Sequence, residues 1–156
     1  MQPLRCIVTD EAFIVEFEID LFNSGSGPAR NIHVAAALIN ASENQDQALA
    51  SFFAQRPGPG DRIPVIEPLK RVTFATQIVT ARDQVQVLEV GGRLVFVPIL
   101  AFNANYAWSS KEGQTSVSYL LGRDGNSEKL APFRLDLGPR LFRTVGARPL
   151  PIGIRR

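Results

Sequence analysis

The stretch NSGSGPAR, residues 23–30, lies between FIVEFEIDLF (residues 13–22) and NIHVAAALIN (residues 31–40), and it decides between two fold classes. A glycine-rich loop between a buried strand and a helix cradles phosphate in nucleotide-binding proteins, whereas the same residue types between two strands form a corner. The two glycines follow the spacing G-x-G, but Arg30 occupies the third glycine position of the dinucleotide pattern. No Gly-Lys-Ser or Gly-Lys-Thr follows them. The stretch therefore predicts a strand-to-strand corner.

The segment before the corner alternates between apolar and polar residues. The odd positions from Phe13 to Leu21 are apolar, while Glu16, Glu18 and Asp20 occupy even positions. This period of two is typical of an antiparallel strand with one buried and one solvated face, whereas the first strand of a nucleotide-binding fold is apolar on both faces. After the corner, the alanines of NIHVAAALIN permit a helix, but its leading Ile-His-Val favours a strand.

One helix is predicted further along the chain. Ser42 and Gln45 have the spacing of a helix-capping box, and Phe52 and Phe53 contribute to an apolar helical face. The prolines between the helix and residue 68 favour a loop or an edge strand there. Strand patterns then recur, and they cover residues 71–80, 94–108 and 115–121.

The resulting fold class is all-β: an immunoglobulin-like antiparallel β-sandwich of about seven to nine strands, with one short helix inserted near residues 43–55. We expect residues 1–138 to form this sandwich. Residues 139–156 form a Pro/Arg-rich C-terminal tail that packs on the domain or trails from it.

The overall composition is that of an ordinary globular domain. Of the 156 residues, 45% are hydrophobic and 21% are charged, and no run of about 18 apolar residues could cross a membrane. The start MQPLRCIVTD lacks the layout of a secretion signal, so the protein is intracellular or has an address or anchor outside this chain. Cys6 is the single cysteine, and an internal disulfide is therefore impossible.

Glu16, Glu18 and Asp20 are the first candidate site. They lie on one strand face, and side chains two residues apart along a strand are roughly 7 Å apart. This spacing could serve a carbohydrate-binding or hydrolytic site, or it could bind calcium. Such a row of carboxylates is also common on the solvent-facing side of an ordinary strand, which is the interpretation we favour. His33 is the only histidine, and its parity predicts a surface or loop-flanking position. No metal-ligand or cofactor pattern is present, and no metal or cofactor is expected.

The C-terminal segment is strongly basic. Beyond Phe133 the chain has six arginines and one acidic residue, Asp136. These arginines could form a surface for an acidic partner, although solvated arginines on a terminal strand are the simpler reading. Nucleic-acid binding is not expected, because the aromatic residues fall mostly on inward parities. The candidate interaction surface consists of Arg140, Arg143, Arg148, Arg155 and Arg156.

Two family resemblances add to these predictions. Asn23, Gly25, Ala29 and Val34 resemble the layout of CARDB-type bacterial immunoglobulin-like modules over residues 12–122, although the later turn of those modules has a glycine where Leu69 stands here. A longer likeness is to a family of uncharacterised alphaproteobacterial proteins with a hydrophobic segment and a Pro-rich linker before such a domain. It is carried by PLR, FFAQ, GGR followed by FVPI, YAW, EGQT, EKLAPFRLDLGPRLF and GARP.

These resemblances imply a membrane-anchored cell-envelope protein, with the cytoplasm as the alternative location. We therefore expect a non-enzymatic binding or structural module that contacts a protein partner through a sheet edge or through the helix insertion. The membrane would be reached by a segment outside this chain. The sequence makes no prediction of the oligomeric state.

Overall fold

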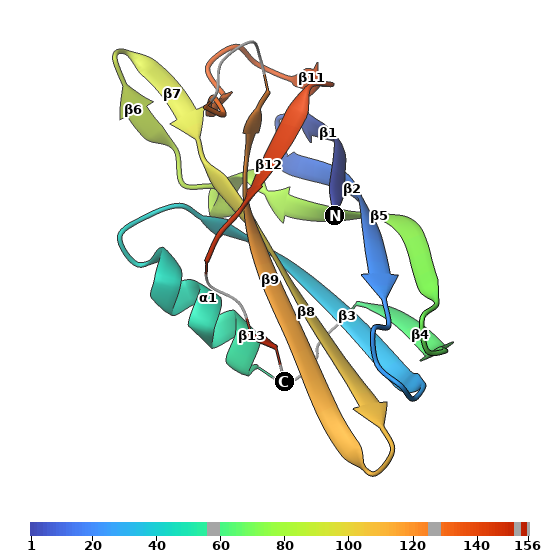
Figure 1. Cartoon of the computed structure of the whole chain (residues 1–156). Helices are drawn as coiled ribbons and strands as arrows, with labels where there is room; N and C mark the ends of the chain where they lie inside the picture. The colour runs from blue at the N-terminus through green and yellow to red at the C-terminus, as the bar shows by residue number, and fades with distance from the viewer. Residues whose placement is uncertain (56–59, 125–128, 152–153, 156) are drawn as a thin grey trace.

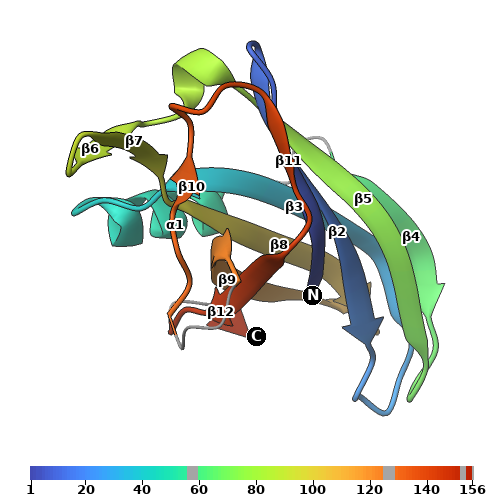
Figure 2. The same cartoon turned by 90° about the horizontal axis from the view of Figure 1, so that it is seen from above.

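The computed structural model describes residues 1–55, 60–124, 129–151 and 154–155 of the chain. Two main antiparallel sheets pack face to face, and one α-helix lies on the outer face of the larger sheet (Figures 1 and 2). This arrangement confirms the predicted all-β sandwich. The described residues contain thirteen strands, because several of the expected strands are divided and pieces of only two or three residues are added.

The smaller main sheet has four strands in the order β11-β1-β2-β5. β2 and β5 pair without a bulge, from Ala12 opposite Ala81 to Phe22 opposite Arg71. β5 is therefore one edge of this sheet along its whole length. The strands are β1 (Gln2–Val8), β2 (Ala12–Phe22), β5 (Arg71–Ala81) and β11 (Arg140–Phe142).

The larger sheet has six strands. Five follow the order β12-β9-β8-β3-β4, and β13 also pairs with β9. The long strands β3, β8 and β9 form its centre, so that β4 and the two C-terminal strands lie at its margins. The bounds are β3 (Ala29–Asn40), β4 (Asp61–Ile66), β8 (Pro98–Trp108), β9 (Lys111–Arg123), β12 (Val145–Pro149) and β13 (Ile154–Arg155).

The remaining elements lie around this sandwich. Helix α1 (Gln45–Ala54) confirms the helix expected near residues 43–55. Its N-cap is Asn44, without a side-chain cap hydrogen bond, so the capping box predicted at Ser42 does not form, although the amide of Ser42 donates to Oε1 of Gln45. The 3₁₀ turn η1 (Arg82–Gln84) follows β5. A small third sheet projects at one end of the molecule (Figure 1) and contains β6 (Leu88–Val90), β7 (Arg93–Phe96) and β10 (Phe133–Arg134).

The glycine-rich stretch is a strand-to-strand corner, as predicted, and Asn23 builds it. The Asn23 side chain donates from Nδ2 to the carbonyl oxygens of Gly27 and Ile66, both at 2.9 Å, and its Oδ1 accepts from the amide of Gly25 at 2.9 Å. The backbone amide of Asn23 also donates to the Lys70 carbonyl. One asparagine thus ties the β2–β3 corner to the end of β4 and to the turn that begins β5.

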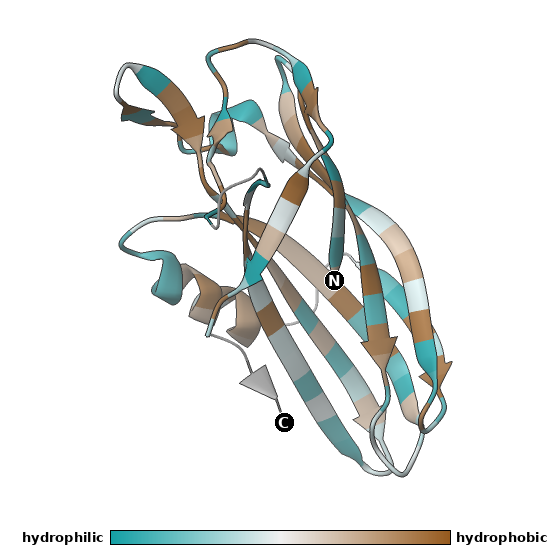
Figure 3. Cartoon of the chain, turned by 45° about the horizontal axis from the view of Figure 1, so that its top comes forward, coloured by the Kyte–Doolittle hydropathy of each residue, from teal (hydrophilic) through white to brown (hydrophobic). Residues whose placement is uncertain are grey.

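The core lies between the two main sheets and confirms the predicted parity of β2. Phe13, Val15 and Phe17 are fully buried, and Ile19 is nearly so. Edge-on aromatic contacts, worth about 0.5–1.5 kcal/mol each beyond burial, link the rings across the core. The ring pairs are Phe13–Phe96, Phe13–Phe133, Phe17–Phe102 and Phe133–Phe142. Figure 3 shows brown and teal bands alternating along the long strands, as this one-sided burial requires.

Helix α1 adds a third layer over the larger sheet. Leu49 and Phe53 pack on Ile99 and Ala101 of β8, so this part of β8 is buried on both faces. The first half of β8 is apolar at both parities, as this cover on both faces requires. Val117 of β9 lies opposite the core residue Phe102 and therefore on the inner face, yet it is 39% exposed.

The C-terminal residues lie on the sandwich. β11 pairs with β1 in the smaller sheet, whereas β12 and β13 both pair with β9 in the larger one. The chain therefore crosses from one main sheet to the other between Phe142 and Val145.

Candidate functional site

The acidic row lies on the outer face of β2, and neighbouring arginines pair with two of its members. Glu16 accepts a bidentate contact from Arg5 on β1, and Asp20 accepts from Arg71 on β5. The Arg5 guanidinium holds the pKa of the Glu16 carboxyl below its usual range, chiefly through the hydrogen bond. This direction is opposite to the raised pKa that a protonated general acid needs, so Glu16 does not resemble one.

The cross-strand neighbours of the row supply no second carboxylate. Glu18 lies opposite Gln2 of β1 and Ala75 of β5, and Asp20 lies opposite Thr73. Across the described part of the chain, no group of three or more His, Cys, Asp or Glu side chains could hold a metal ion. The arrangement of the row is that of surface ion pairs, each contributing about 0–1 kcal/mol.

The C-terminal arginines come from different sheets. Arg140 lies on β11 with its guanidinium carbon 6.0 Å from the ring centroid of Phe142, whereas Arg148 lies on β12 of the larger sheet. Arg143 and Arg148 are exposed. Arg155 belongs to β13, and Arg156 lies outside the described residues.

The structure contradicts the predicted surface position of His33. Its side chain points away from Ile32 and Val34, as parity indicated, but it is only 4% exposed. The outer face of the larger sheet is covered near it, and a Cβ on Gly60 would lie 3.0 Å from Nε2 of His33. Among the described residues, neither nitrogen of His33 has a hydrogen-bond partner, and neither has Nδ2 of the facing Asn105.

A buried polar band continues from His33 across this face. Asn103 and Ser116 are 2% exposed, and the Ser116 hydroxyl donates to Oδ1 of Asn103 at 2.9 Å. Gln114 donates from Nε2 to the Phe53 carbonyl at 2.6 Å and to Oδ1 of Asn103 at 2.9 Å. The last four carbonyls of a helix have no partner within the helix, and this band supplies donors to one of them, the Phe53 carbonyl. The band therefore anchors the C-terminal end of α1 on the sheet.

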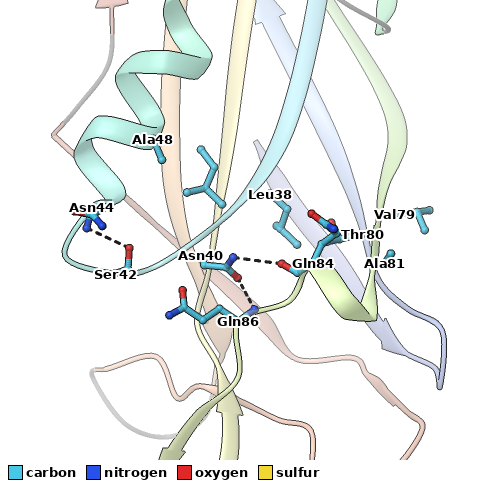
Figure 4. A pocket seen from close by; sticks show the side chains of 11 residues that line it. Leu38, Asn40, Ser42, Asn44, Ala48, Val79, Thr80, Ala81, Gln84 and Gln86 are labelled. Atoms are coloured by element: carbon cyan, nitrogen blue, oxygen red, sulfur yellow. Dashed lines mark hydrogen bonds between the residues drawn. The ribbon is translucent and has the colours of Figure 1, made fainter.

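A pocket of about 500 Å³ lies at the other end of α1 (Figure 4). The side chain of Asn40 lines this pocket. Its Nδ2 donates to the Gln84 carbonyl at 3.4 Å, and its Oδ1 accepts from the backbone amide of Gln86 at 3.0 Å. The remaining lining is amide, hydroxyl and aliphatic, and none of it titrates near neutral pH. This pocket can hydrogen-bond a polar group, but its side chains cannot transfer a proton in the way that general acid–base catalysis requires.

The free edge of β5 is a feature that the sequence did not predict. At the two ends of the β2–β5 ladder, the amide of Arg82 donates to the Glu11 carbonyl and Lys70 accepts from Asn23. Arg82 and Lys70, which flank β5, both have even numbers. Successive residues in a strand direct their backbone groups to opposite sides. The backbone N–H and C=O groups of the even residues of β5 therefore face β2. Those of the odd residues Thr73, Ala75, Gln77 and Val79 point to the free edge.

A groove of about 290 Å³ opens beside this edge, between the two main sheets. Phe17 and Ile19 of β2 and Val34 of β3 form its apolar wall, and Thr76, Gln77 and Ile78 of β5 lie along its rim. Every inward-facing residue of β5, from Val72 to Thr80, is only half-buried. The core is consequently less well covered along β5 than along β2.

The other described edges carry the usual protection against strand pairing. β4 contains Pro64 and begins with Asp61 and Arg62, and β12 contains Arg148 and Pro149. β11 has three residues beginning with an arginine, and β13 has only two. Proline, charge and short length all discourage the addition of another strand. β5 has none of these features from Val72 to Ala81, a stretch with no charged residue, proline or glycine.

No protein-family model, curated protein or solved structure matches this chain. Among the described residues, no helix is long and apolar enough to cross a membrane. Among the described residues, the long uncharged edge of β5 beside the inter-sheet groove is the most distinctive surface.

Proposed function

We propose that this chain is a non-enzymatic protein-binding module that takes an extended polypeptide segment along the free edge of β5. The observation that carries this proposal is the run of outward-directed backbone groups of β5, unpaired among the described residues and flanked by the groove. A strand added there would gain main-chain hydrogen bonds from the edge. Its alternate side chains would point toward the groove and supply selectivity.

The test uses a generic extended peptide, Ac-Thr-Val-Thr-Val-Thr-Val-Thr-NH₂, titrated into isotopically labelled protein. We expect the largest amide shifts in the nuclear magnetic resonance spectrum at Thr73, Ala75, Gln77 and Val79, since their N–H groups face the free edge. The Gln77→Pro variant removes one of these donors and leaves the β2 ladder intact, so the shifts should be strongly reduced. Shifts confined to the pocket at Asn40, or no shifts at all, would refute the proposal.

The setting that we propose for this module is the cell envelope, as the soluble domain of a membrane-anchored bacterial protein. The support is the resemblance of the segments around FFAQ and EKLAPFRLDLGPRLF to the envelope family described above. Membrane fractionation and intact-mass measurement in the native cells test it. A membrane-bound species clearly heavier than 17.1 kDa supports a tether, whereas a soluble species of this mass overturns it.

A further inference from the structure

We infer that the strand received by β5 is the β5 of a second copy of this chain, an inference that rests on the proposed function of this edge. In a two-fold dimer the same patch serves on both partners, so the patch must complement itself. β5 meets this condition because its eleven residues, Arg71–Ala81, pair antiparallel with themselves over their full length when the axis passes beside Thr76.

The parity of β5 is compatible with that register. Thr76 lies opposite the partner's Thr76, and Thr73 lies opposite the partner's Val79. Every residue of β5 is therefore opposite a residue of the same parity. Odd residues, whose backbone groups face the free edge, meet odd residues and can exchange both hydrogen bonds of each pair. Even residues meet even residues, so the inward faces of the two copies stay aligned.

The side chains also complement one another. Half-buried Phe74 comes to lie opposite the partner's half-buried Ile78, and Val72 opposite the partner's Thr80. Aromatic and β-branched residues are the favoured cross-strand neighbours. Each copy thereby covers the less protected flank of the other's core, beside the groove at Phe17 and Val34.

No like charges face each other along the strand. The sole charged residue of β5 is Arg71, which forms an ion pair with Asp20 of its own chain and falls opposite the partner's Ala81. Just beyond the two ends the same register would set Lys70 opposite the partner's Arg82, but these two residues lie in the preceding turn and in η1, where the strand has ended. An arbitrary partner strand would have to match this uncharged stretch, whereas a second copy matches it by symmetry.

Sedimentation equilibrium of the 156-residue chain tests the inference. A single strand pair is a small interface, so the experiment spans about 10 µM to about 1 mM. We expect the mass to rise from 17.1 kDa toward twice that value with concentration. Gln77→Pro should raise the dissociation constant at least about tenfold, because proline removes an outward N–H and its ring occupies the edge.

A charge pair tests the register, using exposed positions that leave the core intact. Ala75 lies opposite the partner's Gln77, so Ala75→Lys with Gln77→Lys sets like charges against each other twice. Ala75→Lys with Gln77→Glu sets opposite charges there instead. We expect about tenfold tighter dimerisation for the Lys/Glu variant than for the Lys/Lys variant. Equal dissociation constants for these two variants would overturn the register.

The same samples separate this inference from the proposed function. A chain that stays monomeric at about 1 mM but binds the Thr-Val peptide at β5 overturns the second copy and leaves the edge as a site for another protein. A monomeric chain that also ignores the peptide overturns both. A dimer whose dissociation constant is unchanged by Gln77→Pro forms through another surface and likewise overturns the inference.

Discussion

Replacing Asn23 by alanine tests whether the corner between β2 and β3 is built as the structure indicates. The substitution removes three side-chain hydrogen bonds of 2.9 Å, to the Gly25 amide and to the carbonyls of Gly27 and Ile66. A hydrogen bond contributes about 0.5–1.5 kcal/mol net to stability, and the half-buried site lets water replace part of the loss. We expect Asn23→Ala to lower the free energy of unfolding by about 2–3 kcal/mol.

Urea unfolding measures this change, since a lower midpoint with an unchanged slope reports a loss of stability. For a chain of this length the midpoint temperature should fall by roughly 4–12 °C. Asn23→Asp provides a matched variant, because it keeps the acceptor for Gly25 but loses both donors and places a carboxylate beside two carbonyl oxygens. Ser26→Ala, an exposed change in the same corner, should stay within about 0.5 kcal/mol of the wild type. If Asn23→Asp restored wild-type stability, the donor bonds to Gly27 and Ile66 would have no role and the reasoning would be wrong.

Two further predictions concern the packing. Gly113→Ala should destabilise the protein by about 1–3 kcal/mol, because the new Cβ would lie 2.4 Å from Cε2 of Tyr106, whereas Gly27→Ala, with nothing within 4 Å, should be near neutral in the same unfolding assay. Burial raises the pKa of the Cys6 thiol to about 12. Native protein should therefore react with a thiol reagent at pH 8 roughly a thousandfold more slowly than urea-unfolded protein, and comparable rates would mean that Cys6 is accessible.

The fold was predictable from local sequence because its signals are local. The alternation in β2 reports one buried face directly, and the broken glycine pattern with Pro28 identifies the corner without any tertiary knowledge. The helix was recognisable from its two phenylalanines, whereas the cap predicted at Ser42 lies two residues before the observed N-cap, Asn44. The division of residues 94–108 into β7 and β8 was less evident, although Pro98 marked the place where the ladder changes partners.

His33 shows where such reasoning stops. Parity correctly placed it on the face opposite Ile32, but parity does not tell whether that face meets water or another layer. Here α1 and the chain at Gly60 cover the outer face of β3 and β8, and the histidine is buried. The polar residues Asn103, Gln114 and Ser116 resemble a solvated strand face in sequence, yet they anchor the end of the helix.

The importance of β5 depends on a different kind of information. An uncharged ten-residue stretch is harmless in the centre of a sheet, where both of its sides are paired, and the sequence alone does not reveal its neighbours. The structure places this stretch at an edge, while prolines and charges occur at β4 and β12. An exposed edge of this kind promotes uncontrolled association unless something pairs with it. The absence of charge from Val72 to Ala81 therefore supports the proposed partner strand, and the symmetric register of β5 provides one of matching length and chemistry.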